Sequence, residues 1–205
     1  MPLRVNRLSA LPATFTTGRA ERAGLWRRDL YLLRDAGMVN EVSRGVYRKA
    51  DAPETAHLAL SAVAHRAPLA VVCLISALAV HELTDEIPAV VQVAVPRGTH
   101  RPRIAYPPTE VSEFDARTFD LGLRKREVAP GERVRIYGAT RSVVDVMRMR
   151  HRIGDPVAGR VFNDLRNMAR REGRSTDELL VLYVLEWFLH RLSRLPYADR
   201  LTVPR

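Results

Sequence analysis

The stretch FTTGRAERAGLWRRDLYLLRDAGMVNEVSRGVYRK, residues 15–49, decides the fold of the N-terminal part of the chain. Thr16 or Thr17 can cap a short helix, because a hydroxyl accepts hydrogen bonds from the free N–H groups of the first turn, and Gly24 can end it. After a turn, a second helix is predicted that stops at Gly37, since glycine tolerates the left-handed conformation there. The apolar side chains of this second helix share one face and are Leu25, Leu30, Leu33 and Ala36.

The end of the same stretch predicts a β-hairpin. In MVNEVSRGVYRK, residues 38–49, two short runs of β-prone side chains lie on either side of Ser43, Arg44 and Gly45. Glycine at such a position favours a tight turn between antiparallel strands. Helix, turn, helix and hairpin follow one another in the order of a winged helix-turn-helix. We therefore predict a winged helix-turn-helix DNA-binding domain over residues 1–50.

The polar side of the second helix predicts a DNA-binding surface. A recognition helix enters the major groove with its N-terminal end, where arginine pairs with guanine edges or with phosphates. Arginines beside the hairpin turn could reach a phosphate or the minor groove. The predicted DNA-binding residues are Trp26, Arg27, Arg28, Tyr31 and Arg34 on the helix, and Arg44 and Arg48 beside the turn. The alternative is that these arginines are ordinary solvated charges on a small helical domain.

The charge of the whole chain suits a polyanionic partner. Its 205 residues include 33 Lys and Arg against 23 Asp and Glu, which gives a net charge of +10. A basic surface gains free energy by releasing counterions from nucleic acid. Only Lys49 and Lys125 of these basic residues are lysines. The alternative explanation of the positive charge is therefore a general bias toward arginine, with the charges forming an ordinary solvated surface.

Residues 55–170 predict a second domain that mixes helices and strands. The expected elements are a helix at 58–64, a buried run at 69–83, a strand at 89–96, turns and short strands on a basic surface at 97–135, and a helical segment at 140–153. Pro156 suits the first position of a further helix. The expected fold class is α+β, with a winged helix-turn-helix followed by a mixed α/β domain and a helical C-terminal tail.

The tail, residues 171–205, contains the clearest helix signal of the sequence. Ser175 and Glu178 have the spacing of a capping box, and the helix is expected to end before Pro196. Its apolar side chains cover nearly the whole circumference, so it must pack on more than one side. We expect Trp187 to be buried against another element or against a second copy of the chain, which would make the chain a homo-oligomer.

Motifs for catalysis, metal binding or nucleotide binding are not recognisable in the sequence. It contains no HExxH or CxxC pair, no GxSxG, no GxxxxGK[ST] and no kinase signature set. We therefore expect no catalytic residue, no metal and no cofactor. Cys73 lies in an apolar run and is expected to be a buried apolar side chain. Neither a signal peptide nor a membrane-spanning segment is predicted, so a cytoplasmic location is expected.

Three segments taken together resemble a known family. They are residues 15–49, SALAVHELTDEIPAVVQVAVPRG at 76–98 and IYGATRSVVDVMRMRHRIGDPVAGRVFNDLR at 136–166. Their order is similar to the AbiEi family of bacterial antitoxins of type IV toxin–antitoxin systems. The most specific pieces are RGVY at 44–47 and the block that begins at Ser76. The resemblance implies a winged helix that binds promoter DNA with repeats, and an antitoxin domain over residues 55–170 that neutralises a nucleotidyltransferase-like toxin.

The tail departs from this family. REGRSTDELLVLYVLEWFLHRLSRLPYADRL, residues 171–201, is instead similar to the opening helix of the partner toxins, whose catalytic core is lacking here. The segment is either a relic of an operon rearrangement or a helix that packs on the toxin or on a second copy of the chain.

Three functions of different classes follow. The leading hypothesis is an antitoxin that neutralises its cognate toxin and represses its own operon by binding promoter DNA, without chemistry of its own. The second is an atypical protein kinase or phosphotransferase that neutralises the toxin by phosphorylating it, although the usual phosphate-cradling loop is missing. The third is a transcription regulator whose second domain responds to a ligand.

Overall fold

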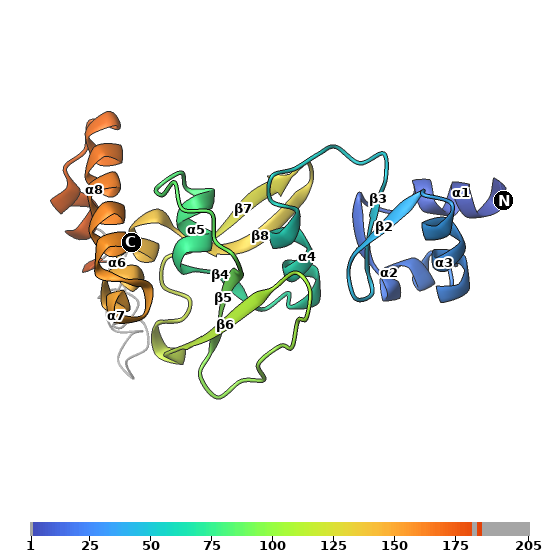
Figure 1. Ribbon diagram of the computed structural model, residues 1–205, viewed down its shortest axis with the longest axis horizontal. Helices are drawn as coiled ribbons and strands as arrows, with labels where there is room; N and C mark the ends of the chain where they lie inside the picture. Colours follow the sequence, from blue (N-terminus) through green and yellow to red (C-terminus); the bar gives the residue numbers. More distant parts are fainter. Residues whose placement is uncertain (1, 182–183, 186–205) are drawn as a thin grey trace, which may run out of the picture.

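The chain folds into an α+β structure with two separate β-sheets, as Figure 1 shows for the computed structural model. The structure describes residues 2–181 and 184–185. A three-stranded sheet belongs to residues 2–49, which we call the N-terminal module. A five-stranded sheet belongs to residues 58–171, which we call the central module. The predicted α+β fold class is therefore confirmed.

Helices and short strands alternate in the N-terminal module. In chain order they are α1 (Pro2–Ser9), β1 (Thr14–Thr16), α2 (Thr17–Arg22), α3 (Arg27–Asp35), β2 (Val39–Ser43) and β3 (Val46–Lys49). The strands pair antiparallel in the order β1-β3-β2, so β3 is the central strand. The two helices and the hairpin expected within residues 15–49 are present, whereas α1 and β1 were not predicted.

The ends of the two predicted helices follow the sequence signals. The Thr16 hydroxyl accepts a hydrogen bond from the backbone N–H of Arg19 at 3.3 Å, which caps the start of α2. Gly37 follows α3 with a φ of +69°, a left-handed conformation that costs glycine little. Ala36 is exposed rather than part of the apolar face, because α3 ends one residue before it.

The N-terminal module has its own apolar core. Leu25, Leu30 and Leu33 are buried as predicted, and they pack with Phe15 from β1 and Tyr47 from β3. The rings of Phe15 and Tyr47 stack with centroids 6.1 Å apart. Burial of Leu30 and Leu33 on one side of α3 fixes which side of this helix remains in contact with solvent.

The central module begins after a linker that spans residues 50–57. Its elements are α4 (Leu58–Arg66), β4 (Val71–Val72), α5 (Leu74–Val80), β5 (Val91–Pro96), β6 (Thr109–Phe114), a 3₁₀ turn (Ala116–Thr118), β7 (Leu123–Ala129), β8 (Glu132–Tyr137), α6 (Ala139–Arg148), α7 (Arg150–Ile153) and α8 (Asp155–Arg171). The strand order is β6-β5-β4-β8-β7. The strand β5 runs parallel to β6, and β4 runs parallel to β8, while the other two pairs are antiparallel.

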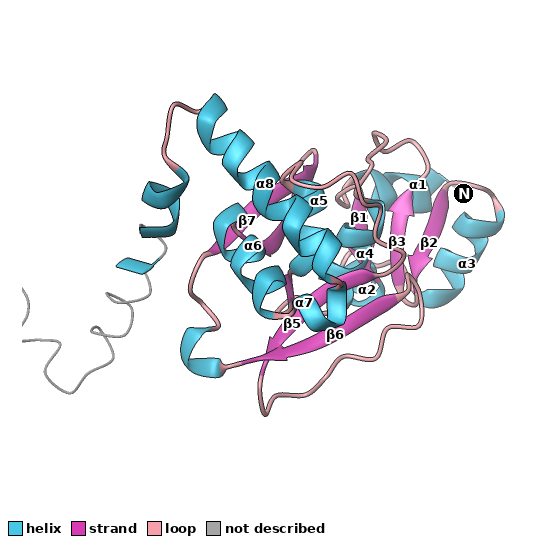
Figure 2. Cartoon of the chain, turned by 60° about the vertical axis from the view of Figure 1, so that its left-hand side comes forward, coloured by secondary structure: helices cyan, strands magenta, loops and turns pink. Residues whose placement is uncertain are grey.

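Helices cover both faces of the five-stranded sheet (Figures 1 and 2). On one face α4 packs through Leu60 and Val63 against strand residues that include Ile136. On the other face, α5, α6 and α8 form a larger cluster with Val71 and Tyr137. Adjacent residues of β4 and β8 thus belong to different clusters, because neighbouring side chains of a strand point to opposite faces. The face covered by α4 is also the one turned toward the N-terminal module in Figure 1.

The apolar run at 69–83 is not one element but two. It divides into the short strand β4 and the helix α5, with Cys73 between them. Cys73 is fully buried as predicted, and this burial raises the pKa of its thiol well above the ordinary value. Leu74, which begins α5, has a φ of +51°, a conformation that is costly for a bulky side chain.

Only the beginning of the predicted tail helix lies within the described residues. Residues 176–181 are helical, and the Ser175 hydroxyl accepts a hydrogen bond from the N–H of Asp177 at 3.2 Å. Glu178 does not complete a capping box but accepts hydrogen bonds from Arg174. Trp187 lies outside the described residues. In the described part of the chain, no helix has the length and apolar character needed to cross a membrane.

Candidate nucleic-acid interface

The exposed side of α3 carries most of the residues predicted to bind DNA. Trp26 and Tyr31 expose 65% and 48% of their surface, which is unusual for large aromatic side chains, and Arg27 and Arg28 are exposed beside them. Leu30 and Leu33 on the other side of α3 are buried in the module core, so these four side chains lie on the side of the helix that faces solvent among the described residues. They come together as the sequence predicts.

The start of α3 is fixed by an acidic side chain. A carboxylate oxygen of Asp29 accepts a hydrogen bond from the N–H of Trp26 at 3.1 Å, and the other contacts Nε of Arg4 on α1 at 2.5 Å. The hydrogen bond from Trp26, together with the contact to Arg4, lowers the pKa of Asp29 below its ordinary value. The N-terminal turn of α3 is therefore held in place by α1, and its arginines project from a fixed backbone.

The arginines of α3 differ in how free they are to take a new partner. Among the described residues, Arg28 has no ion pair, and Arg27 lies 3.8 Å from a carboxylate oxygen of Glu21. Arg34 is more occupied, because it forms an ion pair with Asp35 at 3.0 Å and stacks over the Tyr31 ring with its guanidinium 5.2 Å from the centroid. Arg27 and Arg28 are thus the best placed to contact an anionic partner.

The turn of the hairpin is tied to α2. The backbone N–H and hydroxyl of Thr17 both donate to the carbonyl of Gly45, at 2.9 and 3.2 Å, and the N–H of Gly45 donates to Glu41 at 2.9 Å. Gly45 has a φ of +73°, and a Cβ at this position would lie 3.2 Å from the Thr17 hydroxyl. Arg44 is exposed at the tip of this braced turn.

The structure does not place Arg48 on an exposed surface with the other residues predicted to bind DNA. Arg48 is only 6% exposed, and its guanidinium donates to Thr14 Oγ1 at 2.7 Å, to Glu132 Oε1 at 2.7 Å and to the carbonyl of Pro53 at 2.6 Å. Side chains alternate along β3, so Tyr47 enters the core of its own module and Arg48 points toward the central module. The sequence shows this alternation but not that a second module covers the far side of the sheet.

Arg48 therefore belongs to a junction between the two modules. Glu132, at the start of β8, accepts hydrogen bonds from Arg48 and from the hydroxyl of Ser61 on α4. An apolar contact lies next to this pair and contains Val42, Val46 and Ala62. Ser61 and Glu132 were not identified from the sequence, because nothing near Glu132 in the chain indicates that its partners lie 71 and 84 residues away.

Glu132 makes the junction sensitive to acid. Burial acts to raise the pKa of Glu132, but hydrogen bonds from Ser61 and Thr14 and the charge of Arg48 hold this pKa below the ordinary 4.5. A carboxylate whose pKa is lowered on folding stabilises the folded state above its unfolded pKa and loses that effect as the pH falls through the folded pKa.

We expect the free energy of unfolding, measured in urea between pH 7 and strongly acidic pH, to fall more steeply below pH 4.5 in the wild type than in Glu132→Gln. Parallel curves would contradict this assignment.

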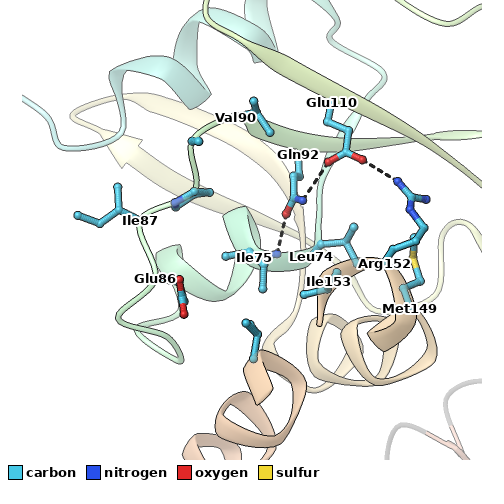
Figure 3. Close-up of a pocket in the computed structure, with 13 residues that line it drawn as sticks. Leu74, Ile75, Glu86, Ile87, Val90, Gln92, Glu110, Met149, Arg152 and Ile153 are labelled. Carbon is cyan, nitrogen blue, oxygen red and sulfur yellow. Dashed lines mark hydrogen bonds and ion pairs between the residues drawn. The ribbon is translucent and has the colours of Figure 1, made fainter. Parts of the chain in front are cut away.

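A pocket of about 310 Å³ lies on the other side of the central module, between α5, the β5–β6 pair and the α7–α8 region (Figure 3). Across it runs a chain of polar contacts. Gln92 accepts from the N–H of Ile75 at 2.9 Å and donates to Glu110 at 3.1 Å, and Arg152 pairs with Glu110 at 2.6 Å. Among the described residues, the remaining charged side chain of the lining is that of Glu86.

In the described part of the chain, no three His, Cys, Asp or Glu side chains gather in a way that could hold a metal ion. No protein-family model matches the chain, and a search of curated proteins gives no match either.

Proposed function

We propose that this chain is a cytoplasmic DNA-binding antitoxin that represses its own operon through a winged helix-turn-helix in residues 2–49 and neutralises a nucleotidyltransferase-like toxin through the central module. The observation that carries the proposal is the exposed side of α3, where Trp26, Arg27, Arg28 and Tyr31 lie in contact with solvent, and where Arg28 forms no ion pair with another described residue. Such a surface suits the major groove, where arginine reads guanine edges.

The order of elements supports the DNA-binding half of this proposal. The helices α2 and α3 follow each other through a short turn, and the β2–β3 hairpin comes directly after α3. In winged helices the second helix of such a pair reads the groove and the hairpin contacts the backbone beside it. Arg44 at the hairpin tip is placed for the second of these roles.

The toxin half of the proposal rests on the resemblance of residues 14–170 to AbiEi antitoxins. No residue of the central module is assigned to the toxin on geometric grounds.

A specific observation also favours a second candidate function, a transcription regulator that responds to a ligand. This observation is the pocket of Figure 3, whose polar chain through Gln92, Glu110 and Arg152 is suited to orient a small polar molecule.

Two measurements test the proposal. In the first, purified full-length protein is titrated against the duplex immediately upstream of its own coding sequence, with a scrambled duplex of equal length as control; equal affinity for both would contradict sequence-specific repression. In the second, the chain is co-expressed with the toxin of its operon, and growth should be restored. Incubation of both proteins with labelled ATP separates the binding antitoxin from the phosphotransferase alternative, because only the latter transfers label to the toxin.

Arg44→Ala is expected to weaken DNA binding by about 1 kcal/mol, to a similar extent for specific and scrambled duplexes, because phosphate contacts position a protein without specifying sequence. The slope of log affinity against log salt concentration should fall by about 1. Fluorescence anisotropy at several salt concentrations measures both quantities. A loss confined to the specific duplex would mean instead that the hairpin reads bases.

A further inference from the structure

The pocket of Figure 3 has a polar wall and an apolar floor. The polar wall is the chain of contacts through Gln92, Glu110 and Arg152. The floor contains the buried side chains of Leu74 and Ile75. Half-buried apolar side chains from the α7–α8 region extend this floor, and they are Met149, Ile153 and Val157. A volume of about 310 Å³ lies near the lower end of the range of ligand pockets, so the site suits a small molecule with one polar and one apolar part.

The charges around the pocket are balanced. Two carboxylates line it, and each belongs to an ion pair: Glu110 with Arg152 at 2.6 Å, and Glu86 with Arg160 at 2.5 Å. An anion such as a nucleotide or a sugar phosphate would bring more negative charge beside the two carboxylates, which costs free energy. A simple cation would do the same beside the two arginines. A ligand that carries one positive and one negative group leaves the balance unchanged.

The central ion pair of the wall keeps the capacity to bind both groups of such a ligand. The guanidinium of Arg152 has further N–H donors besides the one that contacts Glu110, and the side chain is half exposed. The Glu110 carboxylate likewise has more lone pairs than its contacts with Gln92 and Arg152 occupy. A ligand carboxylate on Arg152 and a ligand ammonium on Glu110 would lie close together, as they do when both are bonded to one carbon atom.

The apolar floor is fixed relative to this wall. The side-chain oxygen of Gln92 accepts the N–H of Ile75 at 2.9 Å, so one residue joins the floor to the polar chain. Leu74 has a φ of +51°, and costly backbone conformations of this kind are frequent in ligand-binding sites. A side chain that projects from the carbon atom between Arg152 and Glu110 would meet the apolar surface of Leu74 and Ile75.

The pocket is also connected with the N-terminal module. Glu110 lies in β6, and the connection that leads into this strand carries Tyr106. The carbonyl of Tyr106 accepts a hydrogen bond from the hydroxyl of Ser43, next to the hairpin turn, at 2.6 Å. A ligand bound to Glu110 is therefore held by the same segment that contacts the hairpin.

We propose that this pocket binds a free α-amino acid with an apolar side chain, such as leucine. Its carboxylate pairs with Arg152, its ammonium with Glu110, and its side chain lies on Leu74 and Ile75. The inference names the ligand class of the second candidate function, a regulator that responds to a ligand, and rests on that function for its role in the cell. Binding of the amino acid itself does not require DNA.

The first test uses calorimetric titration of the full-length protein with L-leucine in the absence of DNA. Isocaproate and isoamylamine are the matched ligands, because the first lacks only the ammonium of leucine and the second only its carboxylate. Leucine should bind roughly tenfold more tightly than either, since each analogue loses one charge-assisted hydrogen bond. L-aspartate should bind much more weakly than leucine, because its side chain would place a second carboxylate on the apolar floor. Equal affinity for leucine and for both analogues would overturn the inference.

The second test compares two arginines of α7. Arg152→Gln should weaken leucine binding roughly tenfold. The control Arg150→Gln makes the same change of charge and breaks an exposed ion pair with Asp155, but Arg150 is not among the described residues that line the pocket, so leucine binding should be unchanged. Glu110→Gln should reduce the affinity for leucine and not that for isocaproate, which has no ammonium.

Two further outcomes would overturn the inference. One is the absence of leucine binding to the wild type at millimolar concentration, and the other is an equal loss of binding in Arg152→Gln and Arg150→Gln. Both leave the DNA titration of the proposed function untouched. Failure of the protein to bind its upstream duplex would contradict the proposed function instead, and the leucine titration would still decide whether the pocket binds an amino acid.

Discussion

Replacement of Arg27 and Arg28 by alanine is expected to abolish most of the specific DNA binding of the full-length chain. Each base contact made by an arginine is worth about 1–3 kcal/mol, so the double variant should lose about 2–6 kcal/mol on the upstream duplex. The loss on a scrambled duplex should be much smaller, because only the specific complex contains the base contacts. The fold should be unaffected, since both side chains project from the exposed side of α3.

Affinity measured at matched salt concentration, together with the circular dichroism spectrum of each variant, checks this expectation. The control is Arg166→Ala/Arg170→Ala, which has the same net charge and replaces two exposed arginines of α8. Unchanged affinity for the upstream duplex would remove α3 from the DNA-binding surface. In cells that also carry the toxin, the Arg27→Ala/Arg28→Ala variant should still restore growth although the operon is no longer repressed, because the substitutions lie outside the module assigned to the toxin.

Glu132→Ala is expected to destabilise the folded chain by about 3–5 kcal/mol, the usual effect of leaving one member of a buried ion pair without its partner. Arg48 would remain buried with Thr14 and the carbonyl of Pro53 but without a negative charge. The free energy of unfolding in urea measures the effect. The double variant Arg48→Met/Glu132→Leu is the informative control, because it removes both charges and should recover much of the loss.

An unfolding midpoint of Glu132→Ala equal to that of the wild type would show that the two modules do not depend on this pair. At temperatures where Glu132→Ala remains folded, its affinity for the upstream duplex should equal that of the wild type, since Glu132 does not contact α3.

The parts of the fold that were predicted correctly are those whose signals are local. The cap of α2 at Thr16, the end of α3 at Gly37 and the hairpin around Gly45 depend on residues within a few positions of one another. In contrast, β1 has three residues and exists because it pairs with β3, which lies 30 to 34 positions later in the chain, from Thr14 opposite Arg48 to Thr16 opposite Val46. A segment this short has no periodicity to detect, and its partner cannot be identified from its own composition.

The same distinction explains the outcome for the candidate site. Arg27, Arg28 and Arg44 are exposed, as expected from the apolar spacing around them and from the turn. Arg48 has an equally basic neighbourhood in the sequence but is buried, because α4 and the start of β8 cover its side of the sheet. The basic connection at 97–103, RGTHRPR, was recognised as a basic surface, yet its proximity to the hairpin follows only from the Ser43–Tyr106 contact.

The strand β3 has a consequence for how this protein can evolve. One side of this four-residue strand completes the core of the N-terminal module through Tyr47, and the other side carries Arg48 and Val46 to the central module. Insertion or deletion of a single residue would exchange the two sides, placing a guanidinium in the apolar core and an aromatic ring opposite Glu132. Point substitutions at the exposed hairpin tip disturb neither side. Related sequences should therefore vary freely in the identity of the tip residues while keeping the number of residues between the tip and the linker constant.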